Sequence, residues 1–328
     1  MAKQKTSGTR KKALTTKDLG VYINLLTDFG FKRVFGIKEV MIKFLNSVLD
    51  IEGGIVDLRY DNPEILGFSQ YDRKAVYDLY CITGKDEHVI VEIQSAPQVY
   101  FIDRTLLYVA RLLNAQSEKG KNWNFELPKI FSVNILDFTF EEAALPLGIK
   151  IKRIDENKYV SKVRLMDCDT KEVFYDKLTF LYIELPCFTK ELEDLKTFFE
   201  QLVYVIKNLH KLNNMPEKLR NDEIFEIIFE IAKIARMTRE DVNNYLKDLN
   251  NTAYFVRSTS MNIVRNEIRT RDNIIAQRDN IIAQRDNIIA QRDNIITQKD
   301  NIITQKDNTI AQKDNIIAEY ERRYGVLK

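Results

Sequence analysis

Apolar and polar residues follow different spacings along the chain, and these spacings predict where helices and strands lie. Over residues 25–48 apolar residues recur every three or four positions, as on one face of an α-helix, and Gly53-Gly54 closes this region. A second helical run is expected at residues 100–117, and strands are expected at residues 55–60, 76–82, 88–94 and 130–138. The order helix, strand, hairpin, helix, strand predicts a mixed α/β domain.

The rest of the chain divides into a helical part and a repetitive part. Two more strands are expected at residues 160–166 and 179–185, and helical spacing governs residues 191–262. From Arg271 to Glu319 the unit Arg-Asp-Asn-Ile-Ile-Ala-Gln recurs seven times with small changes. We therefore expect four segments: a basic flexible arm (1–21), an α/β domain (22–190), a helical region (191–265) and a heptad-repeat coiled coil (266–324).

The repeat predicts a long helix, about 70 Å at ~1.5 Å per residue, that self-associates as a left-handed coiled coil through residues 271–319. Its two isoleucines are adjacent, so two registers remain open. With Ile275 at heptad position a, Arg278 occupies d; with Ile274 at a, Gln277 occupies d. Either register alternates apolar and polar layers and leaves the number of chains undecided. The alternative is a solvated single helix, or a repeat expansion without function.

Composition narrows the possible chemistry. Lys and Arg number 50 against 48 Asp and Glu, so any basic surface must be local, as in residues 1–17, which contain no acid. No run approaches the ~18 apolar residues of a membrane span, and the first residues lack the apolar stretch of a secretory signal. Three widely spaced cysteines argue against a disulfide framework or a zinc site and favour a cytoplasmic protein. With only two histidines, carboxylates are the natural candidates for catalysis.

The predicted hairpin brings two carboxylates together. With Lys85 at the centre of its turn, paired positions sum to 170, so Asp78 faces Glu92 and Gln94 projects from the same face. Opposed Cβ atoms are ~5 Å apart, and like charges at that separation repel. Two carboxylates on a half-buried sheet need a shared proton or a bound cation, and oxygen ligands favour Mg²⁺. The alternative is a solvated hairpin end without chemistry.

The Asp, turn and Glu-x-Gln arrangement resembles the PD-(D/E)XK nuclease pattern, with Gln94 where Lys is usual. An ordered set of segments over roughly residues 22–265 is similar to the PD-(D/E)XK nuclease family transposases, or recombination-promoting nucleases. These segments are Thr27-Asp28-Phe29-Gly30-Phe31-Lys32-Arg33-Val34-Phe35-Gly36, Asp72-Arg73-Lys74-Ala75-Val76-Tyr77-Asp78, Val91-Glu92-Ile93-Gln94, Phe101 through Arg104 to Tyr108, residues 116–120 with Trp123, and Tyr182-Ile183-Glu184-Leu185-Pro186.

The resemblance implies a restriction-endonuclease-like core, a mixed sheet flanked by helices, that cleaves DNA with a metal ion. Carried over residue by residue, Asp78 and Glu92 are catalytic Mg²⁺ ligands, and Gln94 is the catalytic residue at the Lys position. Lys would offer positive charge to the attacking water or the developing phosphorane, whereas Gln can only orient. A lower rate would be consistent with this difference, as would charge donated by Lys32, Lys74 or Arg104.

Further residues have both a functional and a structural interpretation. Contacts with DNA phosphates are expected from Lys32, Lys74, Arg104 and Arg111, although a solvated or salt-bridged helix face explains the arginines equally well. Asp28 or Glu64 would add a further acid to the site, but capping of the first helix is the commonest role of an Asp such as Asp28. His88, beside the hairpin turn, is expected to be exposed.

These observations predict a cytoplasmic, Mg²⁺-dependent DNA endonuclease linked to recombination, mobile DNA or phage defence. The alternative is a non-catalytic module in which a degenerate nuclease core binds nucleic acid or protein and the coiled coil assembles it. Gln94 keeps this alternative open, and the presence of both acids argues against it. The sequence leaves open the DNA sequence preference, the number of metal ions and the oligomer order.

Overall fold

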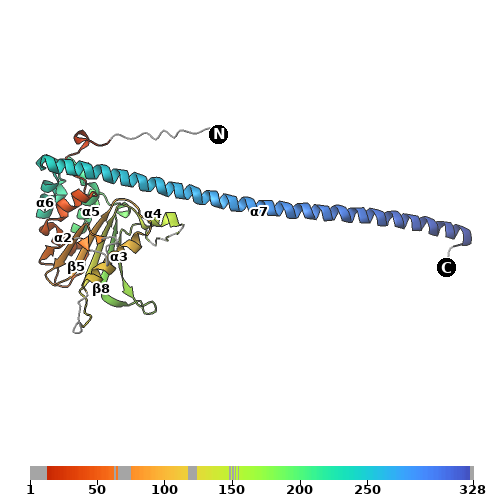
Figure 1. Cartoon of the computed structure of the whole chain (residues 1–328), viewed down its shortest axis with the longest axis horizontal. Coiled ribbons are helices and arrows are strands. Elements are labelled where there is room, and N and C mark those ends of the chain that lie inside the picture. Colours follow the sequence, from red (N-terminus) through yellow and green to blue (C-terminus); the bar gives the residue numbers. More distant parts are fainter. Residues whose placement is uncertain are drawn as a thin grey trace. The chain divides into compact units, whose positions relative to one another are not determined.

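The computed structural model describes residues 13–62, 64–65, 75–116, 124–147, 149, 151, 153 and 155–325. The chain separates into two compact units, residues 1–264 and residues 265–328. Figure 1 labels the main helices and strands along the sequence. Lys74 and the expected stop at Gly120 lie outside the described residues, as do residues 1–12 of the basic arm.

A six-stranded mixed sheet forms the centre of the first unit. The strand order is β1-β4-β5-β6-β8-β7; β5, β6 and β8 run parallel, and the remaining neighbours pair antiparallel. The strands are β1 (Leu58–Tyr60), β4 (Leu79–Thr83), β5 (His88–Gln94), β6 (Ile130–Leu136), β7 (Val160–Met166) and β8 (Val173–Glu184), and a separate pair is formed by β2 (Glu64–Ile65) and β3 (Ala75–Val76). The predicted mixed α/β class is confirmed, and the sheet with its helices fits a restriction-endonuclease-like core.

The predicted helices form, together with a short fourth helix that was not predicted, and the heptad helix begins well before its expected start at residue 266. They are α1 (Asp28–Phe35), α2 (Lys38–Val48), α3 (Phe101–Ala115), α4 (Phe140–Ala144), α5 (Phe198–Asn208), α6 (Glu223–Ala232) and α7 (Arg239–Tyr324). Short 3-10 segments cover Thr16–Asp18, Leu145–Leu147, Leu185–Cys187, Leu192–Asp194, Leu209–Lys211, Glu217–Leu219 and Ile234–Arg236. The single helical region expected at residues 25–48 is two helices, because the chain leaves the helical conformation at Ile37.

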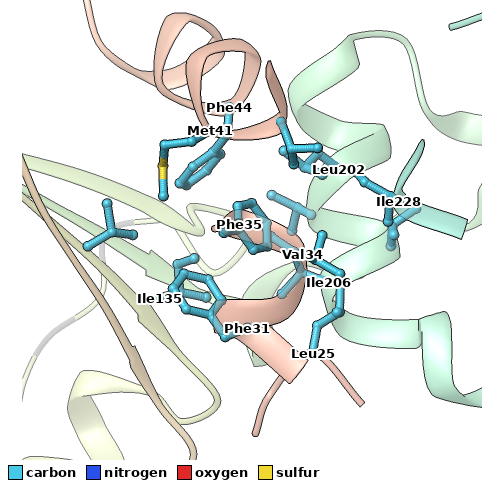
Figure 2. Close-up of a cluster of buried hydrophobic side chains, with 14 of the residues drawn as sticks. Leu25, Phe31, Val34, Phe35, Met41, Phe44, Ile135, Leu202, Ile206 and Ile228 are labelled. Atoms are coloured by element: carbon cyan, nitrogen blue, oxygen red, sulfur yellow. The ribbon is translucent and has the colours of Figure 1, made fainter. Parts of the chain in front are cut away.

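Two apolar layers cover the two faces of the sheet. One face packs with α1, α2, α5 and α6 in the larger core; Figure 2 shows part of it, with side chains of α1, α2, α5, α6 and β6 meeting around Phe35. The other face packs with α3 through a smaller cluster that includes Phe101, Val109 and Leu112. Since α5 and α6 share the larger core with the sheet, residues 191–264 pack as part of the first unit. The expected boundary between residues 190 and 191 stays a prediction.

The repeat is helical, as predicted. Within α7 the isoleucines from Ile274 to Ile317 are each about half exposed. The apolar positions also extend beyond the repeat: every seventh residue from Tyr254 through Met261 and Ile268 to Tyr324 is apolar or aromatic and exposed. Assembly of this helix into a coiled coil stays a prediction. Among the helices that the structure describes, none is long and apolar enough to cross a membrane.

Candidate active site

The hairpin of β4 and β5 has the predicted register over its middle. Leu79 pairs with Val91, Tyr80 with Ile90, Cys81 with Val89, and Ile82 with His88, so each pair of residue numbers sums to 170. The ladder begins at Leu79, one residue after Asp78. Beyond this point the expected pairing of Val76 with Gln94 is wrong, because the chain leaves the hairpin and Val76 pairs with Glu64 in β2 instead.

Asp78 and Glu92 nevertheless meet at this end of the hairpin. The backbone amide of Asp78 donates to Oε1 of Glu92 (3.2 Å), and the amide of Ile93 donates to Oδ2 of Asp78 (2.7 Å). Each carboxylate thus accepts a hydrogen bond from the backbone of the opposite strand or its approach. Glu92 is buried, with 4% of its surface exposed, and Asp78 is partly buried. The predicted neighbours are therefore held together by main-chain contacts.

Asp78 and Glu92 are two acids with too little positive charge nearby to balance them both. Burial raises the pKa of Glu92, and the neighbouring charge of Asp78 raises it further. Burial also raises the pKa of Asp78; Asp28 adds to this increase, whereas Lys32 and Arg104 oppose it. Such a pair favours a shared proton or a bound cation over two free negative charges.

Gln94 lies beside Glu92 and is held from both ends of its amide. Its Nε2 donates to Oε2 of Glu92 (3.2 Å), while its Oε1 accepts from Nη1 of Arg104 (3.2 Å) and from Nε2 of Gln98 (3.1 Å). Gln94 is itself buried. The two predicted catalytic residues on β5 are thus in direct contact, and the orientation of the Gln94 amide is fixed by its neighbours.

Arg104 brings a positive charge to the same place from the first turn of α3. Its Nη2 lies 3.2 Å from Oε2 of Glu92, and its guanidinium stacks over the ring of Tyr108 at 5.1 Å from the centroid. Its Nη1 also donates to Oε1 of Gln98 (2.5 Å). Among the suggested charge donors that the structure describes, it is therefore Arg104 that contacts both Glu92 and Gln94.

Among the other expected site residues, the structure places Lys32 and Arg111 beside other partners. Lys32 forms an ion pair with Asp28 (2.7 Å), and Arg111 lies close enough to Tyr77 to offset part of the rise in the pKa of that phenol. Thr27, whose Oγ1 accepts from Gly30, caps α1, so Asp28 is the first residue of the helix and not its cap. The backbone of Glu64 pairs in β2, and its side chain is outside the described structure.

Two features were not anticipated from the sequence. His88 is buried, not exposed, because its ring stacks on Tyr80 and its Nδ1 is hydrogen-bonded to the Tyr80 hydroxyl. Asn134 on β6 lies in the same register row as Glu92 and is fully buried; within the described structure its Oδ1 has no hydrogen-bond partner. An amide in a strand whose other residues, apart from Ser132, are apolar was the signal that could have pointed to Asn134.

The donor set fits a hard divalent ion. Asp78 and Glu92 offer carboxylate oxygens, the ligand type that Mg²⁺ prefers, and their raised pKa values reflect a charge that a cation would balance. In the part of the chain that the structure describes, no three His, Cys, Asp or Glu residues gather closely enough to hold a metal. Two protein carboxylates would therefore be completed by water or backbone oxygens, as is usual for Mg²⁺.

Comparison with known proteins adds the family. No curated protein and no solved structure matches the chain. The sequence model of the PD-(D/E)XK nuclease family transposases matches residues 25–254, a span that contains the hairpin, α3 and both carboxylates. A family of nucleases implies a hydrolase that acts on nucleic acids. Since this match covers well over half of the sequence, the chain belongs to the PD-(D/E)XK nuclease family transposases.

Proposed function

We propose that this protein is a metal-dependent DNA endonuclease, with Asp78 and Glu92 as the ligands of a Mg²⁺ ion. The observation that carries the proposal is the contact between two acids of raised pKa, the buried Glu92 and the partly buried Asp78, joined by main-chain hydrogen bonds in a chain of a nuclease family. A polar end of a hairpin without function would be expected to expose its carboxylates to water, whereas Glu92 is 4% exposed.

The bound ion would supply Lewis acidity and lower the pKa of a coordinated water. The protein residues have three tasks around it. The main-chain amide of Ile93 holds the carboxylate of Asp78, and the amide of Asp78 together with Arg104 and Gln94 holds that of Glu92. The Gln94 amide, oriented by Arg104 and Gln98, can position a water but carries no charge.

Arg104 is proposed to supply the charge that Gln94 lacks. A preorganised cation beside the reacting phosphate stabilises negative charge that develops in the transition state. Arg104 contacts both Gln94 and Glu92, and 29% of its side chain is exposed, so it also reaches the surface where a phosphate would arrive. Lys32, near Asp78 but paired with Asp28, is the second source of charge.

A plasmid-nicking assay in Mg²⁺, with and without EDTA, tests this proposal. Wild-type protein is expected to nick or linearise supercoiled DNA only without EDTA, and the Asp78→Asn and Glu92→Gln variants are expected to be inactive. Asp176→Asn removes an exposed carboxylate far along the sequence and controls for contaminating nuclease carried through purification. Nicking by Asp78→Asn at the wild-type rate would exclude Asp78 from the chemistry.

Gln94 favours one alternative, a degenerate nuclease core that binds nucleic acid or a protein without cleaving. A neutral amide at the position usually held by Lys removes the charge that assists attack on phosphorus. The same assay distinguishes the two functions when it is paired with a DNA-binding measurement. Binding of DNA without any cleavage, in Mg²⁺ and in Mn²⁺, would favour the non-catalytic module.

We also infer that α7 associates with a second copy of itself, in a protein that works on recombining, mobile or phage DNA in the cytoplasm. The heptad series that contains Ile275 continues in both directions, from Tyr254 to Tyr324, whereas the series that contains Ile274 is interrupted by Thr309. This favours the register with Ile275 at position a. Light scattering on the full chain and on a chain ending at Asn266 measures the number of chains per particle. The same number for both proteins would reject self-association through α7.

A further inference from the structure

A pocket of about 560 Å³ lies between α1 and the first turns of α7. Its lining combines basic and amide side chains, contributed by Lys32 and Arg33 on α1 and by Asn244, Lys247 and Asn251 on α7. The three α7 residues follow each other at intervals of three and four, so they form one stripe along the helix. The pocket is therefore walled by groups that donate hydrogen bonds or carry positive charge.

The acids of the pocket are already engaged within the protein. Asp28 is paired with Lys32, and Oδ2 of Asp248 accepts a hydrogen bond from the backbone amide of Phe29 (2.8 Å). Arg33 is likewise occupied, with Asp241 (3.3 Å) and the carbonyl of Ile231 (3.1 Å). On its α7 side the pocket is thus lined by Lys247 and by Asp248, whose carboxyl is held by the backbone of α1.

The α7 stripe, in contrast, faces solvent. Asn244, Lys247 and Asn251 are exposed, and none of the three forms an ion pair or a side-chain hydrogen bond with another described residue. One cation between two amides, free of internal partners, matches what a phosphodiester needs. Lysine pairs with phosphate as a point charge, and amides donate to phosphate oxygens.

The pocket adjoins the candidate active site. Asp28 and Lys32, which line the pocket, act electrostatically on two groups: they perturb the pKa of Asp78 and that of Asp248 in the same directions. The Asp28–Lys32 pair, which lines the pocket, is therefore near enough to Asp78 to act on its charge.

We propose that the pocket binds the phosphodiester backbone of DNA next to the scissile phosphate, with Lys247 pairing to a phosphate and Asn244 and Asn251 donating to its oxygens. The proposal rests on the proposed nuclease function, since it takes DNA as the substrate. It assigns substrate binding to α7, a helix that carries neither metal ligand. The contacts are to the backbone, so they position DNA without reading its sequence.

The test measures DNA binding apart from cleavage. Full-length Asp78→Asn protein in EDTA is titrated against a fluorescein-labelled DNA duplex by anisotropy, over a series of salt concentrations. Adding Lys247→Gln is expected to lower the slope of log affinity against log salt by about one, and to weaken binding about tenfold at 0.1 M salt. Adding Arg257→Gln, the same loss of charge at an exposed position of α7 outside the pocket, is expected to change neither.

A further variant separates charge from hydrogen bonding. Asn244→Ala with Asn251→Ala is expected to weaken binding severalfold while the salt slope stays constant, because neutral donors release no counterions. Unchanged affinity and slope for Lys247→Gln would overturn the proposal, as would the absence of DNA binding or tighter binding of an RNA duplex of the same sequence. Binding that depends on Lys247 in a wild-type protein that never cleaves would instead reject the nuclease function and leave the pocket in place.

Discussion

Two groups of side chains in the α/β unit each combine two carboxylates with one arginine. In the first, Asp78 and Glu92 are accompanied by Arg104, whose Nη2 lies 3.2 Å from Glu92. In the second, Glu184 at the end of β8 and Glu141 on α4 both bind Arg153, with Nη2 to carboxylate distances of 2.6 Å each. Gln94 on β5 and Glu184 on β8 both pair with Leu136 of β6, the strand between them. The two groups therefore lie at the same end of these parallel strands.

The two groups differ in where the arginine lies. Arg153 sits between its two acids, and Glu141, at the surface, has a pKa lowered by that arginine. Arg104 contacts Glu92 from one side only, and burial raises the pKa of both carboxyls of the hairpin, that of Glu92 further through the charge of Asp78. The count of charges is the same in both groups. Burial and the position of the arginine together distinguish the satisfied ion-pair cluster from the pair that we propose as a cation site.

The largest expected contrast is in catalysis. Glu92→Gln removes a metal ligand and is expected to lower the cleavage rate by about 10³-fold, the upper range for losing one preorganised electrostatic group. Glu184→Gln, the matched change in the satisfied group, is expected to retain cleavage within about tenfold of wild type, because Glu184 touches neither Asp78 nor Gln94 in the described contacts. Initial rates on supercoiled DNA, measured below both melting temperatures, compare them. Equal losses would place both carboxylates in one functional unit.

The contrast reverses for stability. Arg153→Met leaves the 1%-exposed Glu184 without its partner and is expected to lower the free energy of unfolding by about 3–5 kcal/mol, as when a buried pair is broken. Arg104→Met is expected to lower it by about 1 kcal/mol or less, because Arg104 is more exposed and the raised pKa of Glu92 lets this carboxyl take up a proton once its partner is lost. Urea denaturation of both variants at pH 7 measures the difference. A larger loss for Arg104→Met would contradict the comparison.

The sequence predicted the first group far better than the second, because the main residues of the first group are close together in the sequence. Asp78, Glu92 and Gln94 lie on one hairpin, so strand alternation and a turn centred on Lys85 bring them together. The partial failure at Val76 arose because a second strand pair, β2 with β3, captures that residue. Such pairing with a strand outside the hairpin cannot be recognised from the alternation of apolar and polar residues within the hairpin.

Contacts between elements that are distant in the sequence could not be predicted. Arg104 reaches Glu92 because α3 packs on the sheet through Phe101 and neighbouring apolar side chains, a placement that helical spacing alone does not specify. Arg153 comes from an irregular segment and shows no period that could have marked it. The heptad helix itself was evident from its period. A period shows which face of a helix is apolar, however, and not which partner covers that face.

The pH dependence of stability should have opposite signs in the two groups. A carboxyl whose pKa is raised by folding binds more protons in the native state, so the free energy of unfolding falls as pH rises from about 4 through the raised pKa. A carboxyl such as Glu141, with a lowered pKa, adds stability above about pH 4 that is lost as pH falls through the lowered pKa. Asp78→Asn should therefore become more stable relative to wild type as pH rises from about 4.5 to about 7.5 in EDTA, whereas Glu141→Gln should be less stable than wild type above about pH 4 and lose this disadvantage as pH falls below it. Parallel curves for wild type and both variants would show that neither group titrates differently on folding.

The smallest expected effect concerns Asp78 at a single pH. In EDTA at pH 7, Asp78→Asn relieves the repulsion with Glu92 and is expected to raise the free energy of unfolding by roughly 0.2–1 kcal/mol, the scale of a cross-strand pair. Asparagine retains an oxygen for the amide of Ile93, so this main-chain hydrogen bond need not be lost. Stability gained by removing a functional group is typical of sites shaped for a ligand.

Magnesium should invert this order, which makes the small effect measurable. An ion bound only by the native state stabilises it by mass action, by about 2.7 kcal/mol at a concentration of 100 Kd. Wild type is therefore expected to melt below Asp78→Asn in EDTA and above it in Mg²⁺, whereas Asp176→Asn should follow wild type in both. Thermal melts of the three proteins in the two buffers give the result. A variant that gains as much from Mg²⁺ as wild type would show that Asp78 is not a ligand, and the two carboxylate groups would then differ only in how their arginines are placed.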